Sequence, residues 1–366
     1  MKKMAVITLH DVKNYGSILQ TYATQCYFEK MGYEVTIIDY RRPWETTWGY
    51  WTYLNERNLT GFARNIMYFP SKVIQYFRFN EFLHKRIKLS KASYKSAEEL
   101  KNNPVIADVY CTGSDQVWNS GWNEGVIAEY FLNFVDKNLN TKKISFSASF
   151  GNSDLRDSEI AEITQYLKEY DLITVREKKS AEFLVNSLNL QAYEILDPTL
   201  QMNGDFWKEL CDPDRILDQK YVLLIQLNRN HDFDRIAEKF ANKQHLKLVR
   251  LCLRVDQIFL YGKKIVVPKV ENYIALIRDA EYVLTDSFHA ISFSVNLNKQ
   301  FYCYLPEKYA ERLNSILEML DLENRVIGED WTMEAESIDY TRINKIIDNK
   351  RNEAKEIMER VLGNER

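Results

Sequence analysis

The chain has 366 residues, of which 45% are hydrophobic and 28% are charged, and its formal net charge is −3. This length is typical of about two domains, and the composition is that of a soluble protein able to bury two cores. The near-neutral charge excludes a broad nucleic-acid-binding surface, and no apolar run approaches the roughly 18 residues of a membrane span.

The N-terminal segment predicts a βαβ unit. Its apolar part is too short for a signal peptide and leads into a polar loop that starts at His10. The next helix ends at Gly32, a residue suited to a helix C-cap. The loop before that helix holds a single glycine, Gly16, which is a weak signal for anion binding. The expected elements are a strand over 4–9, a helix over about 18–31 and a strand over 34–39.

Residues 41–89 differ in character, because aromatic and basic side chains alternate along them. We interpret the segment as an aromatic helical insertion that packs against the first domain. The alternative is an interfacial surface, since aromatic and basic residues together suit a membrane boundary. The aromatic residues are Trp44, Trp48, Tyr50, Trp51, Tyr53, Phe62, Tyr68, Phe69, Tyr76, Phe77, Phe79 and Phe82.

Strands and helices then alternate regularly to the end of the chain. A cluster of Gly, Asp and Pro at 204–213 marks the expected boundary between two domains. The strands are expected at 105–112, 143–148, 172–175, 193–196, 221–227, 247–253, 264–267, 280–284 and 301–305. The helices are expected at 158–168, 177–188, 233–242, 270–278 and 338–362.

This pattern predicts an α/β fold with two Rossmann-like domains that face each other across a cleft, where the active site would lie. The N-terminal domain is expected over 1–205, including the insertion at about 41–89. The C-terminal domain is expected over 206–337. A charged C-terminal helix would occupy 338–366.

The segment 285–290 is the most informative part of the chain. It places His289 in the turn between a buried strand and a helix, at the carboxyl edge of a parallel sheet, where open α/β sheets bind ligands. The N-terminus of the following helix favours an anion. The alternative is a core histidine that bonds a backbone carbonyl.

The five cysteines are far apart and odd in number, which is typical of reduced core thiols in a cytoplasmic protein. No pair of them has the spacing of metal ligands, so we expect no metal.

Several short motifs together resemble the polysaccharide pyruvyl transferase family over most of the chain. The motifs are Asn14-Tyr15-Gly16-Ser17 with Leu19-Gln20, Gly113 to Asn119, Val175-Arg176-Glu177, Asp197-Pro198-Thr199-Leu200 and Thr285 to His289. The resemblance implies a fold similar to B-type glycosyltransferases. It also implies transfer of a pyruvyl group from phosphoenolpyruvate to a sugar, with phosphoenolpyruvate as donor substrate and no separate cofactor. The domain over 1–205 would then be the acceptor side and the domain over 206–337 the donor side.

Many members of that family have an Arg-Leu pair directly before the histidine, whereas this chain has Ser287-Phe288. A cation from elsewhere must therefore hold the donor phosphate, or the donor differs. The alternatives to pyruvyl transfer are a nucleotide-sugar-dependent glycosyltransferase of the same fold and a non-catalytic assembly protein.

Ketal formation needs an acid, a base and cations for a carboxylate and a phosphate. We assign the acid to His289, because imidazole titrates near neutral pH. Asp115 follows the tight strand exit at Gly113-Ser114 and is the candidate base, although it could equally cap a helix or form an Asx turn. Asp286 is expected to cap the next helix, and His10 is a weaker candidate for a site role.

The substrate-binding candidates lie at expected strand ends and at the start of the first helix. Arg229 is the best replacement for the missing arginine, since a guanidinium can bind carboxylate or phosphate bidentately. A solvated loop position is the alternative for Arg229. For Arg176 the alternatives are an ion pair with Glu177 and a surface position. The full set is Arg229, Arg176, Arg254, Gly16, Ser17, Ser114 and Ser287.

The implied setting is cell-surface polysaccharide biosynthesis in the cytoplasm, at the inner face of the membrane if the acceptor is lipid-linked. In that setting the aromatic segment Trp44–Phe82 would help the enzyme to meet such an acceptor.

Overall fold

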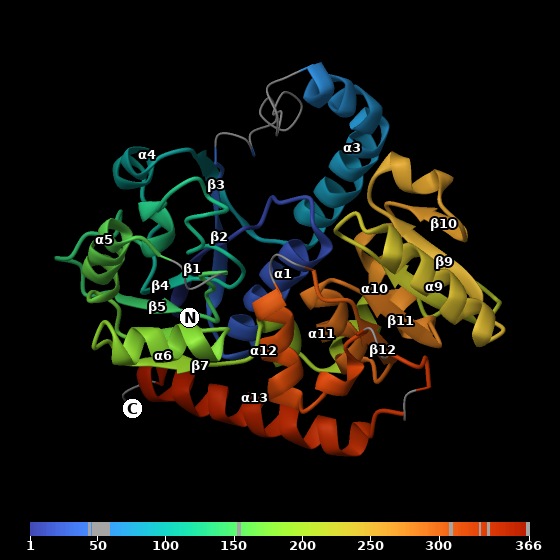
Figure 1. Cartoon of the computed structure of the whole chain (residues 1–366). Coiled ribbons are helices and arrows are strands. Elements are labelled where there is room, and N and C mark those ends of the chain that lie inside the picture. Colours follow the sequence, from blue (N-terminus) through green and yellow to red (C-terminus); the bar gives the residue numbers. More distant parts are fainter. Residues whose placement is uncertain are drawn as a thin grey trace. The chain divides into compact units, whose positions relative to one another are not determined.

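The computed structural model describes residues 1–42, 45, 59–151, 155–306, 310–328, 331–334 and 337–363, without the side chains of 59–66. The chain divides into two compact units, drawn together in Figure 1. Unit 1 comprises Met1–Gly49, Leu83–Gln201 and Lys345–Arg366, and unit 2 comprises Tyr50–Phe82 and Met202–Asn344.

Unit 1 is built on a parallel five-stranded sheet with the order β3-β2-β1-β4-β5. Single bridges from Ile144 to Leu172 and from Ala148 to Val175 extend it toward the β6–β7 pair. The strands are β1 (Lys3–Ile7), β2 (Glu34–Tyr40), β3 (Leu89–Tyr94), β4 (Val109–Thr112), β5 (Lys142–Ser145), β6 (Ile173–Val175) and β7 (Ala192–Glu194). The helices are α1 (Tyr15–Lys30), α4 (Ala97–Asn102), η1 (Ala128–Phe131), α5 (Asp157–Leu167), α6 (Lys178–Asn186) and α7 (Pro198–Gln201).

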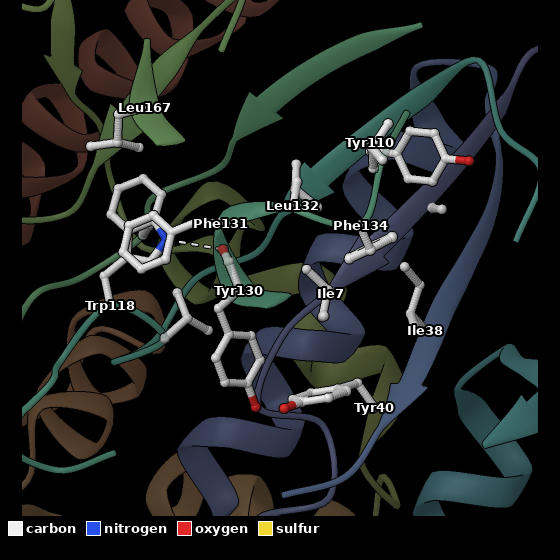
Figure 2. Close-up of a cluster of buried hydrophobic side chains, with 14 of the residues drawn as sticks. Ile7, Ile38, Tyr40, Tyr110, Trp118, Tyr130, Phe131, Leu132, Phe134 and Leu167 are labelled. Carbon is white, nitrogen blue, oxygen red and sulfur yellow. Dashed lines mark hydrogen bonds between the residues drawn. The ribbon is translucent and has the colours of Figure 1, made fainter. Parts of the chain in front are cut away.

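The central strands of unit 1 are buried on both faces, as parallel sheets require. Every residue of β4 is buried, and four of the five residues of β1 are. One face of this sheet carries an aromatic core, shown in Figure 2. There Trp118 stacks on Phe131 at 5.2 Å and donates its indole N–H to the Tyr130 carbonyl at 3.0 Å. Side chains from β1, β2, β4 and α5 complete the core.

Unit 2 repeats the same topology, with the strand order β10-β9-β8-β11-β12. Its strands are β8 (Tyr221–Ile225), β9 (Lys247–Cys252), β10 (Lys263–Val266), β11 (Tyr282–Thr285) and β12 (Gln300–Cys303). Its helices are α8 (Gly204–Leu210), α9 (His231–Lys243), η2 (Val255–Phe259), α10 (Val270–Asp279), α11 (Phe288–Asn296), α12 (Ala310–Leu320) and η3 (Glu323–Arg325). The sheet packs against the amphipathic helix α9 through Phe233, Ala237 and Phe240, which are fully buried.

Two long helices run from one unit into the other. Helix α3 (Leu59–Arg86) passes from unit 2 to unit 1, and α13 (Tyr340–Leu362) belongs mostly to unit 1. Within the part of the chain that the structure describes, no helix is both long and apolar enough to cross a membrane.

The α/β fold with two parallel sheets predicted from the sequence is confirmed. Three local predictions were wrong. The polar segment Leu89–Tyr94 forms an edge strand, whereas the sequence analysis ended the insertion there. The strand predicted over 105–112 begins at Val109. His289 lies inside the first turn of α11, because Ser287 caps that helix one residue before it begins.

The division into units also cuts across the linear order of the chain. Residues 50–82 of the expected insertion group with unit 2, and residues 345–366 of the C-terminal helix group with unit 1. Each unit is therefore built from segments that are not continuous in the sequence. The predicted domain ranges, which are 1–205, 206–337 and 338–366, stay a prediction.

Candidate functional site

In each unit the strand order reverses direction next to the first strand. The chain moves from β1 to β2 on one side and returns to β4 on the other, and β8, β9 and β11 repeat this arrangement. Open α/β sheets bind ligands at such switch points, outside the carboxyl ends of the strands. Most candidate site residues follow strands β1, β4, β8 and β11, which flank the two switch points, whereas Arg176 follows β6 and Arg254 follows β9.

Direct contacts join the two sides of the switch point in unit 1. Thr8, just after β1, donates its hydroxyl to the Ser114 carbonyl at 3.0 Å, just after β4. Ser17 Oγ donates to Asp115 Oδ2 at 2.5 Å. Gly113 is required here, because a Cβ at that position would lie 2.8 Å from Thr8 Cβ. The two loops are therefore packed as one surface.

Asp115 is buried and sits in the left-handed backbone region, with φ of 70°. Few residue types other than glycine adopt this region, although Asp and Asn tolerate it. Its carboxylate accepts from Ser17 Oγ and from the Gln116 N–H at 2.9 Å. The helix-cap alternative is wrong, because turns and no helix follow this residue.

Helix α1 begins at Tyr15, so Gly16 and Ser17 lie in its first turn, three residues earlier than the sequence indicated. Asn14 caps the helix, and its side-chain oxygen accepts from the N–H groups of Gly16 at 2.8 Å and Ser17 at 3.4 Å. The Ser17 hydroxyl is therefore the group of this turn that reaches Asp115.

Arg176 follows β6 and is buried among carboxylates. Its Nε donates to Glu177 Oε1 and its Nη1 donates to Asp197 Oδ2, both at 3.0 Å. Burial lowers the pKa of the Arg176 guanidinium, but Glu177 and Asp197 outweigh burial and hold that pKa above its usual value. Ser114 Oγ donates to the same Asp197 oxygen at 3.1 Å. The ion pair with Glu177 is thus confirmed, and a surface position for Arg176 is excluded.

A second charged group lies at the ends of β1 and β2. His10 Nε2 lies 2.8 Å from Asp39 Oδ1, and Arg41 Nε donates to the same oxygen at 2.7 Å. Arg41 also pairs with Asp11 at 2.9 Å, and Asp11 pairs with Lys13. All of these side chains are at most 20% exposed. The sequence signalled His10 here but not its partner.

The switch point of unit 2 contains His289, which is 7% exposed, in the first turn of α11. Its ring packs edge-on against Phe288 with the ring centroids 5.2 Å apart. Ser287 caps the helix by accepting from the Ala290 N–H at 3.4 Å. The His289 ring therefore lies beside a capped helix N-terminus.

Asp286 does not cap α11, which corrects the sequence expectation. Its carboxylate reaches across the switch point and accepts from the N–H groups of Leu227 at 2.7 Å and Asn228 at 2.8 Å, and from the Asn228 side chain at 3.0 Å. Burial raises the pKa of Asp286, and these donors offset only part of that rise. Asp286 thereby ties the loop after β8 to the loop after β11.

Arg229 and Arg254 share one carboxylate in unit 2. Arg229 Nη2 and Arg254 Nε both donate to Asp256, on different oxygens. The hydrogen bond to Asp256 holds the pKa of Arg229 above its usual value. The Arg229 side chain is 58% exposed, and Arg254 is 25% exposed while its Nη1 donates to the Leu227 carbonyl at 2.9 Å. Because two guanidinium groups share one carboxylate, the group formed by Arg229, Arg254 and Asp256 has a net positive charge.

The structure therefore gathers Gly16, Ser17, Ser114, Asp115 and Arg176 in unit 1, and Arg229, Arg254, Ser287 and His289 in unit 2. Their assigned roles stay predictions. Sequence reasoning named no partner for Asp115 or His10, and it missed Asp197, Asp39 and Asp256 as charged partners. Asp39 is the last residue of the strand predicted over 34–39, and Asp197 precedes a proline directly after the strand predicted over 193–196. Both positions therefore indicated a place at the carboxyl end of a strand.

Comparison with known proteins places these motifs in a family. The model of the polysaccharide pyruvyl transferase family matches residues 14–307. No curated protein is similar enough in sequence to count as a relative.

Among solved structures, a UDP-N-acetylglucosamine 2-epimerase aligns with a TM-score of 0.51 and 9% identity, covering 100% of this chain and 97% of that chain. A UDP-GlcNAc 2-epimerase from Neisseria meningitidis bound to UDP-GlcNAc gives 0.50 and 10%, covering 100% of both chains. At these identities the likeness shows the fold alone.

Proposed function

Because the chain belongs to the polysaccharide pyruvyl transferase family, we propose that it moves a pyruvyl group from phosphoenolpyruvate to two hydroxyls of a saccharide, forming a ketal. The observation that carries this proposal is the extent of the family match. It begins at residue 14, in the loop after β1, and runs past His289 to residue 307. It thus includes most of the candidate loops of both units.

The proposed reaction starts with a proton delivered to the methylene carbon of the donor. The cation that develops at C2 is captured by one saccharide hydroxyl, which loses its proton to a base. The bond between C2 and the phosphate oxygen then breaks and phosphate leaves. A second hydroxyl attacks C2 and closes the ring, and its proton ends on the released phosphate. The products are a ketal and inorganic phosphate, so no oxidant, reductant or further co-reactant is consumed.

We assign the acid to His289 and the base to Asp115. An imidazole can give a proton at neutral pH, and general acid–base catalysis of this kind contributes about 10²–10⁴-fold. Asp115 already accepts a hydrogen bond from the Ser17 hydroxyl at 2.5 Å, so its carboxylate is oriented to accept from a hydroxyl group.

The donor carries a carboxylate and a phosphate, both of which need cations. In unit 2, Arg229 is the most exposed of the candidate arginines and shares only one carboxylate with Arg254. Arg176 in unit 1 is already paired with two carboxylates. We therefore place the donor phosphate on Arg229 and Arg254, in compensation for Ser287-Phe288 before His289.

The test is a phosphate-release assay with phosphoenolpyruvate and a panel of galactosides, glucosides and mannosides. Release that depends on an added sugar supports the proposal. A parallel thermal-shift series compares phosphoenolpyruvate with UDP-sugars, since a ligand at 100 times its dissociation constant stabilises by about 2.7 kcal/mol. Stabilisation by a UDP-sugar alone would favour glycosyl transfer, and stabilisation by neither would favour a non-catalytic protein.

A further inference from the structure

The exposed large apolar side chains of unit 2 lie on two segments, helix α3 and residues 259–261. Among the described residues of this unit they are Met67, Phe69, Phe77, Phe259 and Tyr261. Phe77 is 66% exposed and Phe259 is 84% exposed. Single exposed hydrophobic residues are ordinary, but a contiguous group of them marks an interaction surface.

Hydrogen bonds hold α3 against the segment that carries the other two residues. Gln75 Nε2 donates to the Leu253 carbonyl at 2.7 Å, just before η2. Arg78 Nη1 donates to the Val267 carbonyl, just after β10. Phe259 and Tyr261 lie on the chain between these two anchor points, so α3 and this segment belong to one continuous part of unit 2 (Figure 1).

Helix α3 presents an apolar face outward as well as inward. Phe79 and Phe82 are each 1% exposed and form the inward face. Met67, Pro70 and Phe77 are exposed at separations of three and seven residues, which places them along one outer face. A helix whose outer face is apolar is unusual in water and indicates a partner for that face.

Positive charge lies directly beside the exposed rings. Lys263 and Lys264 are both exposed and follow Tyr261 after the turn at Gly262, which has φ of 105°. The chain as a whole is weakly acidic, so this placement is local. Aromatic rings flanked by lysine suit the boundary of a bilayer with anionic headgroups, where rings enter the acyl boundary and ammonium groups meet phosphates.

We propose that this surface, formed by residues 67–77 of α3 and residues 259–264, binds a membrane face that carries anionic lipids. The inference depends on neither the donor nor the acceptor, so it stands apart from the proposed reaction. The proposed surface differs from the segment Trp44–Phe82 that the sequence suggested. Phe79 and Phe82 are buried and are not part of it, whereas residues 259–264 are. Trp44, Trp48 and Trp51 lie outside the described residues.

The test is flotation of the full chain with vesicles of phosphatidylcholine alone or of phosphatidylcholine with phosphatidylglycerol. We expect binding to the anionic vesicles and little binding to the neutral ones. Binding should weaken as salt is raised from 0.05 to 0.5 M, since charges at a surface are screened over about 10 Å at 0.1 M ionic strength.

Two variants separate the contributions to binding. Phe77→Ser with Phe259→Ser should reduce affinity for anionic vesicles about tenfold or more, because two rings no longer enter the acyl boundary. Lys263→Gln with Lys264→Gln should reduce it by a similar factor and remove most of its salt dependence, because the two positive charges are gone. The matched control is Ile106→Ser, since Ile106 is an exposed apolar side chain of unit 1, 69% exposed, and should leave binding unchanged.

Phosphate release and thermal unfolding, measured on the same variants, report separately on activity and folding. The proposal is overturned if wild type floats with neither vesicle type at low salt. It is overturned equally if the Phe77→Ser, Phe259→Ser protein binds as wild type does. A concentration-dependent dimer that this double variant abolishes would assign the surface to a second copy of the chain and also reject the membrane.

Discussion

His289 lies in the first turn of α11, almost buried and edge-on to Phe288. We predict that His289→Ala folds normally and lowers pyruvyl transfer by about 100-fold or more, as loss of a general acid would. Single-turnover phosphate release measures this directly. His289→Asn, which keeps a polar side chain but cannot deliver a proton at neutral pH, is the control and should be equally slow. Normal turnover in either folded variant would reject His289 as the acid.

Arg229 offers the donor a more exposed guanidinium than Arg254 or Arg176 does. We predict that Arg229→Ala raises the apparent donor constant, with a loss of about 1.5–3 kcal/mol in donor binding and little change for the acceptor. Steady-state kinetics with each substrate varied in turn checks this.

The control for that experiment is Arg235→Ala, because Arg235 is an exposed arginine of α9 whose ion pair is local, with Asp232. If Arg229→Ala binds the donor as wild type does, the donor phosphate would have to be bound by Arg254 or Arg176 instead.

The turn after β4 constrains Asp115 in two ways, through its positive φ and through its bond to Ser17. Asp115→Asn tolerates the same backbone and keeps one acceptor oxygen, but it loses the carboxylate charge. We predict that this variant folds with wild-type stability and loses about 100-fold or more in turnover. Asp115→Ala should lose about 1–2 kcal/mol of stability in addition. Full activity of Asp115→Asn would reject Asp115 as the base and leave it only a role in forming the turn after β4.

Asp39, at the end of β2, makes the free energy of unfolding depend on pH in the acid range. Burial raises the pKa of Asp39, but the hydrogen bonds from His10 and Arg41 outweigh burial and hold that pKa well below its usual value. A carboxyl whose pKa is depressed by folding stabilises the native state above its unfolded pKa of about 3.9, and that contribution is lost as the pH falls further.

We therefore predict that Asp39→Asn is less stable than wild type by about 3 kcal/mol at pH 7, because His10 and Arg41 lose their buried partner. The difference should shrink as the pH falls below about 4. Urea unfolding between pH 7 and pH 3 measures it, with the exposed Asp218→Asn as control. A difference that stays constant over this range would contradict the assignment of the acid sensitivity to Asp39.

Helix α13, near the C-terminus of the sequence, packs into unit 1 and forms hydrogen bonds with it. Ala354 and Met358 are fully buried, and the Leu362 carbonyl accepts from the Tyr33 hydroxyl at 3.1 Å. Arg351 Nε donates to the Leu200 carbonyl at 2.7 Å. A chain that ends at residue 344 loses all of these contacts.

We predict that this truncation destabilises unit 1 by more than about 3 kcal/mol, since removing a single buried Met side chain costs about 2–5 kcal/mol. Calorimetry should show an early transition for the truncated chain, and removal of residues 364–366 alone is the control. An unchanged thermogram would show that unit 1 keeps its stability without residues 345–366.

The alternation of strands and helices and the motifs at the strand ends can be predicted from the amino-acid sequence. Apolar runs bounded by Gly, Asn and Asp are local signals, so β8, β9 and α10 could be predicted within about two residues. Edge strand β3 could not, because its six residues form no apolar run and its pairing with β2 makes it a strand. The motifs also sufficed for the family, since each is a short run of adjacent residues.

Which charged groups lie in contact depends on the three-dimensional fold and could not be predicted from the sequence. Ser17 and Asp115 are 98 positions apart, His10 and Asp39 are 29 apart, and Asp286 reaches back 58 positions to Asn228. Side-chain chemistry at one position fixes what a group can bond, but not which strand lies next to it. The order of parallel strands sets those neighbours, and that order is a property of the whole sheet and of the connections between its strands. For this reason Asp286 could be read locally as a helix cap while the fold uses it to join two loops.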